Sequence, residues 1–502
     1  MTDYRAGLRT FPEAAETSAT LDVEGSLPPW LDGTLLRNGP GRFDVGGRDL
    51  THWFDGLALP RRYGFDPAAG TVDYRVRFLR SETYRGAREG RLVSDQFATP
   101  AGFATGPRAR LTRLAGAVVA PDADAPWPLS ALDATPTDNA LVSFARVGDR
   151  LAAVTETPRM VALDPETLAA EETFEYDDDL DLTGSLGHVG HDPVRGESVN
   201  LGVRYGRESE YVLTRRPDGA RAREVVARVG VDRPSYVHSF ALTPRYAVVT
   251  LSPFVTRPRD LLLAETFLEA FSWRPERGTR FLVVDRETGD VTRLRTDPAF
   301  VFHHAAAFAD DGVVTVDLVA HPDHRAVTGL SLAALRSGRP GLPPGSLRRY
   351  RLDLADGSVA STTLHAGAVE FPTLDYGAAV GPGRHGWVAL AATDPDPPVG
   401  LPTRIDRLDL ATGDRRSWAR PGTYPGEPLF VPRTPASERD GETEAGVLLV
   451  ELLDPDADRT ELVVLDALTC DRLARVTLPS ALPLGFHGQY LRPGHPHERT
   501  MA

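Results

Sequence analysis

Histidines in strand-like segments are the residues of this sequence with the clearest chemical potential. Imidazole is a common ligand of iron, copper and zinc, and a metal site collects such ligands from separate segments. A single histidine in a strand is usually structural. Four short apolar segments, however, hold six of the 13 histidines, and together they indicate a metal site. Their spacing adds little, because the successive gaps from His188 onward, 50, 65 and 184 residues, are irregular. The candidates are His188 and His191 in 187–193, His238 in 235–240, His303 and His304 in 301–305, and His487 in 485–488.

The other seven histidines have surroundings that favour other roles. His52 lies in the segment 51–56 (THWFDG), where packing or a hydrogen bond within a turn is expected. Six lie in turn-like segments or in the polar C-terminal tail and are expected to be solvated: His321, His324, His365, His385, His495 and His497.

Three glutamates lie in apolar, strand-like surroundings, where an unpaired carboxylate would be costly. They are Glu156, Glu370 and Glu427. An imidazole N–H is one suitable partner, and a carboxylate behind a metal-bound histidine orients and polarises that ligand. An arginine partner, or a place at an exposed edge, is the alternative at each position.

The elements that would carry these residues are short strands joined by tight turns. An apolar residue followed by Asp, a short loop and often Gly recurs at Asp66, Asp164, Asp285, Asp353, Asp409 and Asp466. Such segments are typical of β-hairpins. The last four aspartates lie 68, 56 and 57 residues apart, which is about the length of one propeller blade. We therefore expect an all-β chain that folds as a β-propeller, with a decorated β-sandwich as the alternative.

Helical patterns are few and resemble insertions on a β scaffold. Residues 260–271 (DLLLAETFLEAF) have helical spacing, and 330–335 is a second short candidate. Insertions of this kind often cover a site. No shift in composition marks a second domain, so residues 1–502 are expected to form a single propeller domain, with peripheral tails at about 1–20 and 491–502.

Composition restricts the partners and the compartment. The chain has 502 residues, a net charge of −14 and no lysine, and an acidic chain argues against a nucleic-acid partner. The single cysteine, Cys470, excludes internal disulfides and is expected to be a buried thiol. Neither a signal peptide nor a membrane-spanning run is recognisable. We expect a soluble, cytoplasmic protein that could still contact a membrane peripherally, at its inner face.

Several ordered motifs between about residues 27 and 490 resemble the carotenoid cleavage oxygenase family. They are 27–40 (LPPWLDGTLLRNGP), 52–56 (HWFDG), 137–139 (TDN), 234–240 (PSYVHSF), 424–432 (YPGEPLFVP) and 483–488 (PLGFHG). The first motif and 234–240 are most similar to the branch of β-carotene oxygenases and retinoid isomerases. The resemblance implies a seven-bladed propeller with Fe(II) on its axis, under a cap of loops and short helices.

The resemblance also implies a set of site residues. The iron ligands would be His188, His238, His303 and His487. His188 is preferred to His191 because Asp192-Pro193 follows at the family's spacing, and His303 is preferred to His304 because an aromatic residue precedes it. The carboxylates behind the ligands would be Glu156 for His238, Glu370 for His303 and Glu427 for His487. Thr155 would lie near the open coordination position.

The implied activity is cleavage by dioxygen of a double bond in a carotenoid or apocarotenoid, an apolar polyene. Central cleavage of β-carotene to retinal is one such reaction. Stilbene cleavage, retinoid isomerisation and a non-catalytic binding propeller are the alternatives. The sequence departs from the family in having Ala306 three residues after the third ligand, and in lacking a cysteine in 96–106, so membrane contact there would depend on Phe97 and Phe103.

Overall fold

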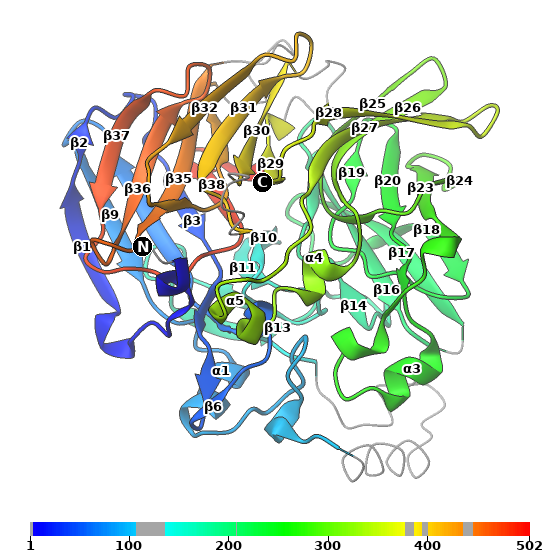
Figure 1. The fold of residues 1–502 in the computed structure, drawn as a ribbon, viewed down its shortest axis with the longest axis horizontal. Coiled ribbons are helices and arrows are strands. Elements are labelled where there is room, and N and C mark those ends of the chain that lie inside the picture. The colour runs from blue at the N-terminus through cyan, green and yellow to red at the C-terminus, as the bar shows by residue number, and fades with distance from the viewer. Residues whose placement is uncertain are drawn as a thin grey trace.

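Seven antiparallel sheets of four or more strands stand around a common axis and form a seven-bladed β-propeller (Figure 1), as the sequence predicts. The computed structural model describes residues 4–106, 136–206, 208–376, 386–393, 400–434 and 445–501. Each blade is a twisted sheet whose first strand lies nearest the axis, so residues that begin the first strands come together although they are far apart in the sequence.

The seven blades are numbered here in chain order. Blade 1 consists of β1 (Thr17–Asp22), β9 (Thr71–Val76), β8 (Arg61–Asp66), β3 (Thr34–Arg37), β38 (Gly488–Arg492) and β39 (His495–Met501). Blade 2 consists of β10 (Ser143–Val147), β11 (Arg150–Val154), β12 (Met160–Leu163) and β13 (Ala170–Phe174). Blade 3 consists of β14 (Gly184–Ser185), β15 (Gly190–Asp192), β16 (Glu197–Arg204), β17 (Ser209–Pro217) and β18 (Glu224–Val231).

Blades 4 to 6 have four strands each, and blade 7 has six. Blade 4 consists of β19 (Ala241–Leu242), β20 (Tyr246–Leu251), β23 (Thr279–Asp285) and β24 (Val291–Thr296). Blade 5 consists of β25 (Phe300–Asp310), β26 (Val313–His321), β27 (Ser346–Asp353) and β28 (Val359–His365). Blade 6 consists of β29 (Val369–Thr373), β30 (Trp387–Ala392), β31 (Arg404–Asp409) and β32 (Arg415–Ala419). Blade 7 consists of β33 (Tyr424–Pro425), β34 (Leu429–Pro432), β35 (Gly446–Asp454), β36 (Arg459–Asp466), β37 (Arg472–Thr477) and β2 (Glu24–Gly25).

The ring is closed by pairing the two ends of the chain in blade 1. Strand β38 provides the first strand of this blade and pairs with β3, with Leu35 opposite Tyr490. Residues 1–20 are predicted to be a peripheral tail, but in the described part of this segment Tyr4 and Leu8 are buried and β1 pairs with β9, because the segment packs against the closing blade. The closure therefore depends on both chain ends.

The propeller has two unlike faces. Because successive strands are antiparallel, the turns from the first to the second strand and from the third to the fourth lie on one face, which we call the turn face. The recurrent aspartates lie in hairpin turns, as predicted, and all six of these turns join the third strand to the fourth on this face. In blade 4, for example, Asp285 Oδ1 accepts hydrogen bonds from the amides of Glu287 (2.9 Å) and Thr288 (3.2 Å).

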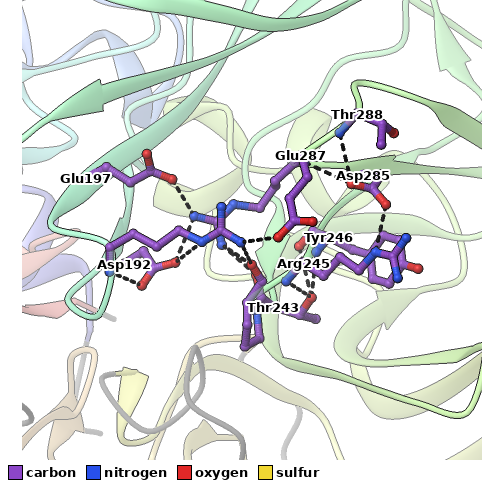
Figure 2. Close-up of polar contacts among 11 residues, drawn as sticks. Asp192, Glu197, Thr243, Arg245, Tyr246, Asp285, Glu287 and Thr288 are labelled. Atoms are coloured by element: carbon purple, nitrogen blue, oxygen red, sulfur yellow. Dashed lines mark hydrogen bonds and ion pairs between the residues drawn. The ribbon is translucent and has the colours of Figure 1, made fainter.

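An ionic contact between blades 3 and 4 lies on the turn face (Figure 2), where Asp192 and Glu197 face the turn at Asp285. Arg286, in that turn, donates from Nη2 to Asp192 Oδ2 (2.8 Å) and to Glu197 Oε1 (2.7 Å). Its Nη1 donates to the carbonyl of Thr243 (2.7 Å). The guanidinium is buried, and it holds one edge of blade 3 against blade 4.

The connections from the second to the third strand lie on the opposite face, which we call the cap face, and several are long. They carry short sheets and helices: β4 (Pro40–Arg42) with β7 (Leu57–Ala58), β5 (Asp44–Val45) with β6 (Arg48–Asp49), β21 (Phe254–Val255) with β22 (Ser272–Trp273), η3 (Trp53–Asp55), α3 (Pro258–Leu263), η6 (Leu268–Ala270), η7 (Pro275–Arg277), α4 (Arg325–Thr328) and α5 (Leu332–Arg336). The connection between blades 1 and 2 adds α1 (Glu82–Arg88) and η4 (Ala101–Phe103), and the N-terminal segment adds η1 (Tyr4–Leu8) and η2 (Glu13–Ala15).

The two predicted helices are only partly correct. The segment 260–271 is split into α3 and η6 because Ala264 is extended and ends α3. The second helix begins at Leu332 rather than at Leu330, after the hydroxyl of Ser331 caps it by accepting from the Ala334 amide.

Apolar side chains fill the space between neighbouring blades. One cluster joins blades 3 and 4 through residues such as Leu201 and Val249, and another joins blades 4 and 5 through Phe281 and Val316. Cys470 is buried, as predicted. Among the described residues no helix is long and apolar enough to span a bilayer.

Candidate metal centre

Every blade contributes one polar residue to a cluster on the axis, at the cap face. The seven residues, in blade order from 1 to 7, are His487, Glu156, His188, His238, His303, Glu370 and Glu427. Six of them lie within the first four residues of their blade's innermost strands or up to three residues before them, and Glu156 follows the end of β11. These are the residues that the family resemblance implies, and the structure brings all seven together.

The four histidines point their ring nitrogens at one another. The Nε2 atom of His188 lies 3.1 Å from Nε2 of His238 and 3.1 Å from Nε2 of His487. One nitrogen from each of the four buried rings lies within 4.8 Å of all the others. The Nε2 atom of His303 is buried without a hydrogen-bond partner in the described part of the chain. Four lone pairs converging on one point fit a transition-metal ion.

The electrostatics of the cluster keep the rings available as ligands. Burial lowers the pKa of His188 well below its usual range, and the nearby imidazoles of His487, His238 and His303 lower it further. Burial also lowers the pKa of His487 in the same way, with His303 next in effect. A metal ligand must be neutral imidazole, so a site that disfavours imidazolium favours metal binding.

Three of the four rings are supported by a carboxylate at the second ring nitrogen. The Nδ1 atom of His238 lies 2.5 Å from Glu156 Oε1, that of His303 lies 2.6 Å from Glu370 Oε2, and that of His487 lies 2.5 Å from Glu427 Oε1. Hydrogen bonds of this kind fix the ring orientation and the tautomer with Nε2 free. No described carboxylate supports His188 in this way.

Each carboxylate has a different second partner. Glu156 accepts from the hydroxyl of Tyr236 (2.9 Å), whereas Glu370 Oε1 lies 2.7 Å from Nε2 of His321. Glu427 Oε2 accepts from Arg37 Nη1 at 2.6 Å. The three supports therefore range from a neutral phenol to a full guanidinium charge.

Burial disfavours the anionic form of Glu370 and of Glu427, and the partners of each carboxylate oppose this effect. Burial alone would raise the pKa of Glu370, but the charges and hydrogen bonds of His303 and His321 outweigh it and lower the pKa below its usual range. At Glu427, burial is the stronger effect and raises the pKa to about 7, with Arg37 opposing the rise.

The two histidines next to the cluster lie outside it. His191 is directed to the turn at Asp218, with Nε2 3.1 Å from Oδ2 of that residue. His304, the next residue of β25, points to the other side of the strand, and its Nε2 atom lies 2.7 Å from Thr250 Oγ1 of blade 4. The preference for His188 and His303 therefore agrees with the geometry.

The prediction of solvated histidines is wrong at two positions. His321 and His365 are both buried, since each is the last residue of a strand whose end is covered. His365 Nε2 lies 3.2 Å from Asp406 Oδ2, at a distance from the axis that keeps it out of the cluster. His324 is partly buried and stacks on Trp273. His52 packs as expected and caps η3 by accepting from the Phe54 amide. His385, and the side chains of His495 and His497, lie outside the described part of the chain.

A cavity of about 650 Å³ lies against the histidine cluster, between the blades and the cap. His238, His303 and His487 form part of its wall, and most of the rest is apolar. The aromatic members are Trp53, Tyr205, Tyr236 and six phenylalanines, Phe54, Phe97, Phe267, Phe302, Phe371 and Phe486. Two of these rings lie directly on the ligands, with Phe302 5.2 Å from the His238 ring and Phe371 5.3 Å from the His303 ring. Such a cavity fits a long apolar molecule next to the metal position.

Thr155 and Phe97, for which the sequence predicts a functional role, both line this cavity. Thr155 is buried in its wall, beside Glu156. Phe97 also lines the cavity and contacts Tyr236 (5.7 Å between ring centroids), so its ring is not presented outward to a membrane. Phe103 is partly buried against the core. Sequence reasoning missed His321 and Tyr236, which contact the supporting carboxylates.

Comparison with known proteins gives consistent matches over nearly the whole chain. The family described as retinal pigment epithelial membrane protein (RPE65) matches residues 10–492. The mitochondrial carotenoid-cleaving dioxygenase of Macaca fascicularis is 30% identical over 97% of this chain and 94% of its own length. The β,β-carotene 15,15'-dioxygenase of Rattus norvegicus is 30% identical over 93% of this chain and 88% of its own.

Solved structures share the fold. A variant of the Synechocystis apocarotenoid oxygenase superposes with a TM-score of 0.81 at 24% identity, and covers 98% of each chain. The cobalt-substituted form of that oxygenase superposes with a TM-score of 0.80 at 24% identity. The family match, the relatives and the four-histidine cluster agree, and the chain belongs to the retinal pigment epithelial membrane protein family of carotenoid cleavage oxygenases.

Proposed function

We propose that this chain is an Fe(II)-dependent dioxygenase that cleaves a carbon–carbon double bond of a carotenoid or apocarotenoid. The observation that carries the proposal is the cluster of four buried, converging imidazoles against an apolar cavity of about 650 Å³. His188, His238, His303 and His487 would hold the ion. Bound there, Fe(II) would supply the electrons that let dioxygen react with an electron-rich alkene.

The reaction breaks one carbon–carbon double bond and the O–O bond, and it forms two carbonyl groups. Both oxygen atoms of dioxygen therefore leave in the two products, and no external reductant is needed. The protein's own part is placement, because holding a double bond at a fixed position converts an unselective oxidation into cleavage at one bond.

The cavity wall supports this placement. Phe54, which comes from η3 in the cap, packs on Phe486 and Phe302, with ring centroids 5.2 and 6.1 Å apart. The rings of the cap and the blades thus meet over the ligands, where they exclude water and offer flat apolar surfaces to a polyene. Thr155, also in the wall, would lie near the open coordination position.

The substrate class rests on the relatives, whose names include carotenoid-cleaving and β-carotene-cleaving dioxygenases. Central cleavage of β-carotene to retinal is the first reaction to test. An apolar substrate of this kind is nearly insoluble in water, so we also propose a cytoplasmic, single-domain protein over 1–502 that collects its substrate at a membrane surface through peripheral contact. No nucleic-acid partner is proposed.

The test is aerobic incubation of the iron-loaded protein with carotenoids, apocarotenals, stilbenes and retinyl esters, followed by mass analysis of the products. With ¹⁸O₂, the proposal expects two carbonyl products that each carry one label. Cleavage of stilbenes alone would replace the substrate class. Isomerised retinoid without label would replace the reaction, and a protein that takes up no iron and changes no substrate would be a binding propeller.

His191→Ala is the matched control for His188→Ala, since the two histidines lie three residues apart and only His188 belongs to the cluster. The proposal expects iron content and cleavage to fall only in His188→Ala. Equal loss in both variants would contradict the assignment of the site.

A further inference from the structure

The cavity wall contains a phenol that has no hydrogen-bond partner among the described residues. Tyr205 follows β16 on the cap face of blade 3, lines the cavity and is 6% exposed. Its hydroxyl has no hydrogen-bond partner among the described residues, whereas the hydroxyl of Tyr236, in the same wall, donates to Glu156 (2.9 Å). A buried donor without an acceptor is unfavourable, so an unpaired phenol in an otherwise apolar cavity points to an acceptor on the ligand.

Several neighbouring polar side chains in this part of the wall already have partners in the protein. Their contacts are Thr157 Oγ1 to the carbonyl of Thr137 (2.8 Å), Thr183 Oγ1 to the carbonyl of Val203 (3.0 Å), Thr137 Oγ1 to Gln96 Oε1 (3.1 Å), and Asn200 Nδ2 to Ser185 Oγ (3.0 Å). These groups fasten the wall together. Tyr205 differs from these groups, because its hydroxyl neither donates to nor accepts from any of the described residues.

The ring of Tyr205 is held in place by aromatic contacts. It meets the rings of Phe267 and Phe271 edge-on, with centroids 5.8 and 6.4 Å apart. Phe267 adjoins η6 in the cap, so Tyr205 is fixed where the cap meets blade 3. Burial raises the pKa of its hydroxyl well above the usual range, which keeps the proton on the oxygen and the group a donor.

The opposite side of the cavity offers a natural comparison. Thr393 follows β30 on the cap face of blade 6, three blades away around the ring, and its hydroxyl also has no partner among the described residues. Its surroundings in the wall, which include Leu401 and Pro402, are apolar. The two hydroxyls therefore mark opposite sides of the axis, with the histidine cluster between them.

We propose that Tyr205 donates a hydrogen bond to an oxygen atom at one end of the substrate and thereby selects polyenes that carry a terminal carbonyl or hydroxyl group. This inference rests on the proposed carotenoid-cleaving function and narrows it to oxygenated carotenoids or apocarotenoids. The oxygenated end lies over blade 3, and the remainder of the chain crosses the metal position toward blade 6. This contact fixes the distance from the oxygen to the bond that is cleaved.

Binding to the iron-loaded protein without oxygen tests the proposal, because ligands then bind without being consumed. The ligands are β-carotene, which has no oxygen, an apocarotenal, which ends in an aldehyde, and a carotenoid with hydroxylated rings. Dissociation constants are measured by quenching of the intrinsic tryptophan fluorescence for the unchanged protein, Tyr205→Phe and Thr393→Val. Iron content and thermal unfolding are recorded for each protein.

We expect Tyr205→Phe to lower the affinity for the apocarotenal, relative to that for β-carotene, by about tenfold, which is the effect of one lost hydrogen bond. The unfolding temperature should not change. Thr393→Val should leave that ratio unchanged. An unchanged ratio in Tyr205→Phe, or a change in Thr393→Val instead, would overturn the proposal. If the protein without substitutions binds stilbenes but none of the three polyenes, the proposed function itself is overturned. This outcome needs no variant, so it cannot be confused with a failure of the Tyr205 proposal.

In aerobic reactions, the same contact predicts a second readout. Tyr205→Phe should release an oxygenated substrate from its register, so that more than one double bond is cleaved and the product mass distribution broadens. A single product mass from Tyr205→Phe, identical to that of the unchanged protein, would show that the phenol does not set the register.

Discussion

The two faces of the propeller are built from the same strands, but they have different roles. On the turn face, short connections bind their own backbone through aspartates and join the blades through Arg286. On the cap face, longer connections carry the helices, the aromatic lining and the residues that surround the histidine cluster. A face made of short turns offers few side chains for binding or catalysis, whereas long loops on a rigid ring can provide the residues of a functional site.

The contrast teaches that stability and chemistry are separable in this molecule. Changes on the cap face should alter metal binding or substrate choice and leave the ring intact. Changes on the turn face should alter the free energy of unfolding and leave the metal site intact in the molecules that remain folded.

The largest effect is expected from His188→Ala. The ring leaves the cluster without stranding a carboxylate, because no described carboxylate pairs with His188, so loss of iron should be the main consequence. Iron content should fall to a small fraction, and activity by about a hundredfold or more. Metal analysis and product yield measure these losses. The free energy of unfolding of metal-free His188→Ala should be close to that of the metal-free protein without the substitution. A fully loaded, active His188→Ala would break the assignment of the cap face to chemistry.

The next effect is expected from Arg286→Met on the turn face. The substitution removes the buried guanidinium that binds both Asp192 and Glu197, and leaves Asp192 only the more distant Arg195 (3.7 Å); loss of such a buried partner costs about 3–5 kcal/mol of unfolding free energy. Urea denaturation measures the cost, and iron bound per folded molecule should be unchanged.

Arg245→Gln is the matched control for Arg286→Met. Arg245 also binds a carboxylate, Asp285, at 2.8 Å, but its side chain is 59% exposed, so less than about 1 kcal/mol is expected. Equal costs for the two arginines would show that burial of Arg286 contributes nothing to the junction between the blades.

A smaller effect on the cap face is expected from Glu370→Gln, which weakens the support behind His303. Metal affinity should fall about 10- to 100-fold, because the amide no longer polarises the ring. Competition with a chelator measures the affinity. Asp406→Asn is the control, since Asp406 pairs with His365 in the same part of the ring but away from the cluster. An equal loss of metal affinity in Asp406→Asn would mean that the effect of Glu370→Gln does not come from its contact with His303.

The smallest effect is expected from Asp353→Ala in the blade 5 turn. Asp353 Oδ1 accepts from the amides of Ala355 (2.8 Å) and Asp356 (3.2 Å), and losing such a turn contact costs about 1 kcal/mol. The exposed Asp414, in the corresponding blade 6 turn, makes no side-chain hydrogen bond with described residues, so Asp414→Ala should be neutral. A change in iron content for either variant would contradict the separation of the faces.

The sequence predicts the propeller and the cluster well because both leave local traces. The aspartate turns recur at the blade repeat, and each ligand lies in a motif with a recognisable neighbour, such as Phe302 before His303. The preference between adjacent histidines came from those motifs, because alternation in a strand alone does not say which of His303 and His304 faces the axis.

What the sequence does not predict depends on contacts between distant segments. His321 is followed by Pro322 and Asp323, which suggested a turn, yet it closes β26 and contacts Glu370 of the next blade. The apolar run 313–320 that leads into it is the signal that could have placed it in a strand. Nothing local marks Tyr205, since only the assembled wall shows that its hydroxyl lacks a partner.

The distribution of the cluster over all seven blades has a consequence for how the protein matures. The last imidazole, His487, lies immediately before the strand that closes the ring against β3. A nascent chain that has not yet reached this residue presents three imidazoles at most, however well its earlier blades have folded. Loading of the metal is therefore coupled to completion of the ring, and a translation product cut short before residue 487 would remain without the full ligand set.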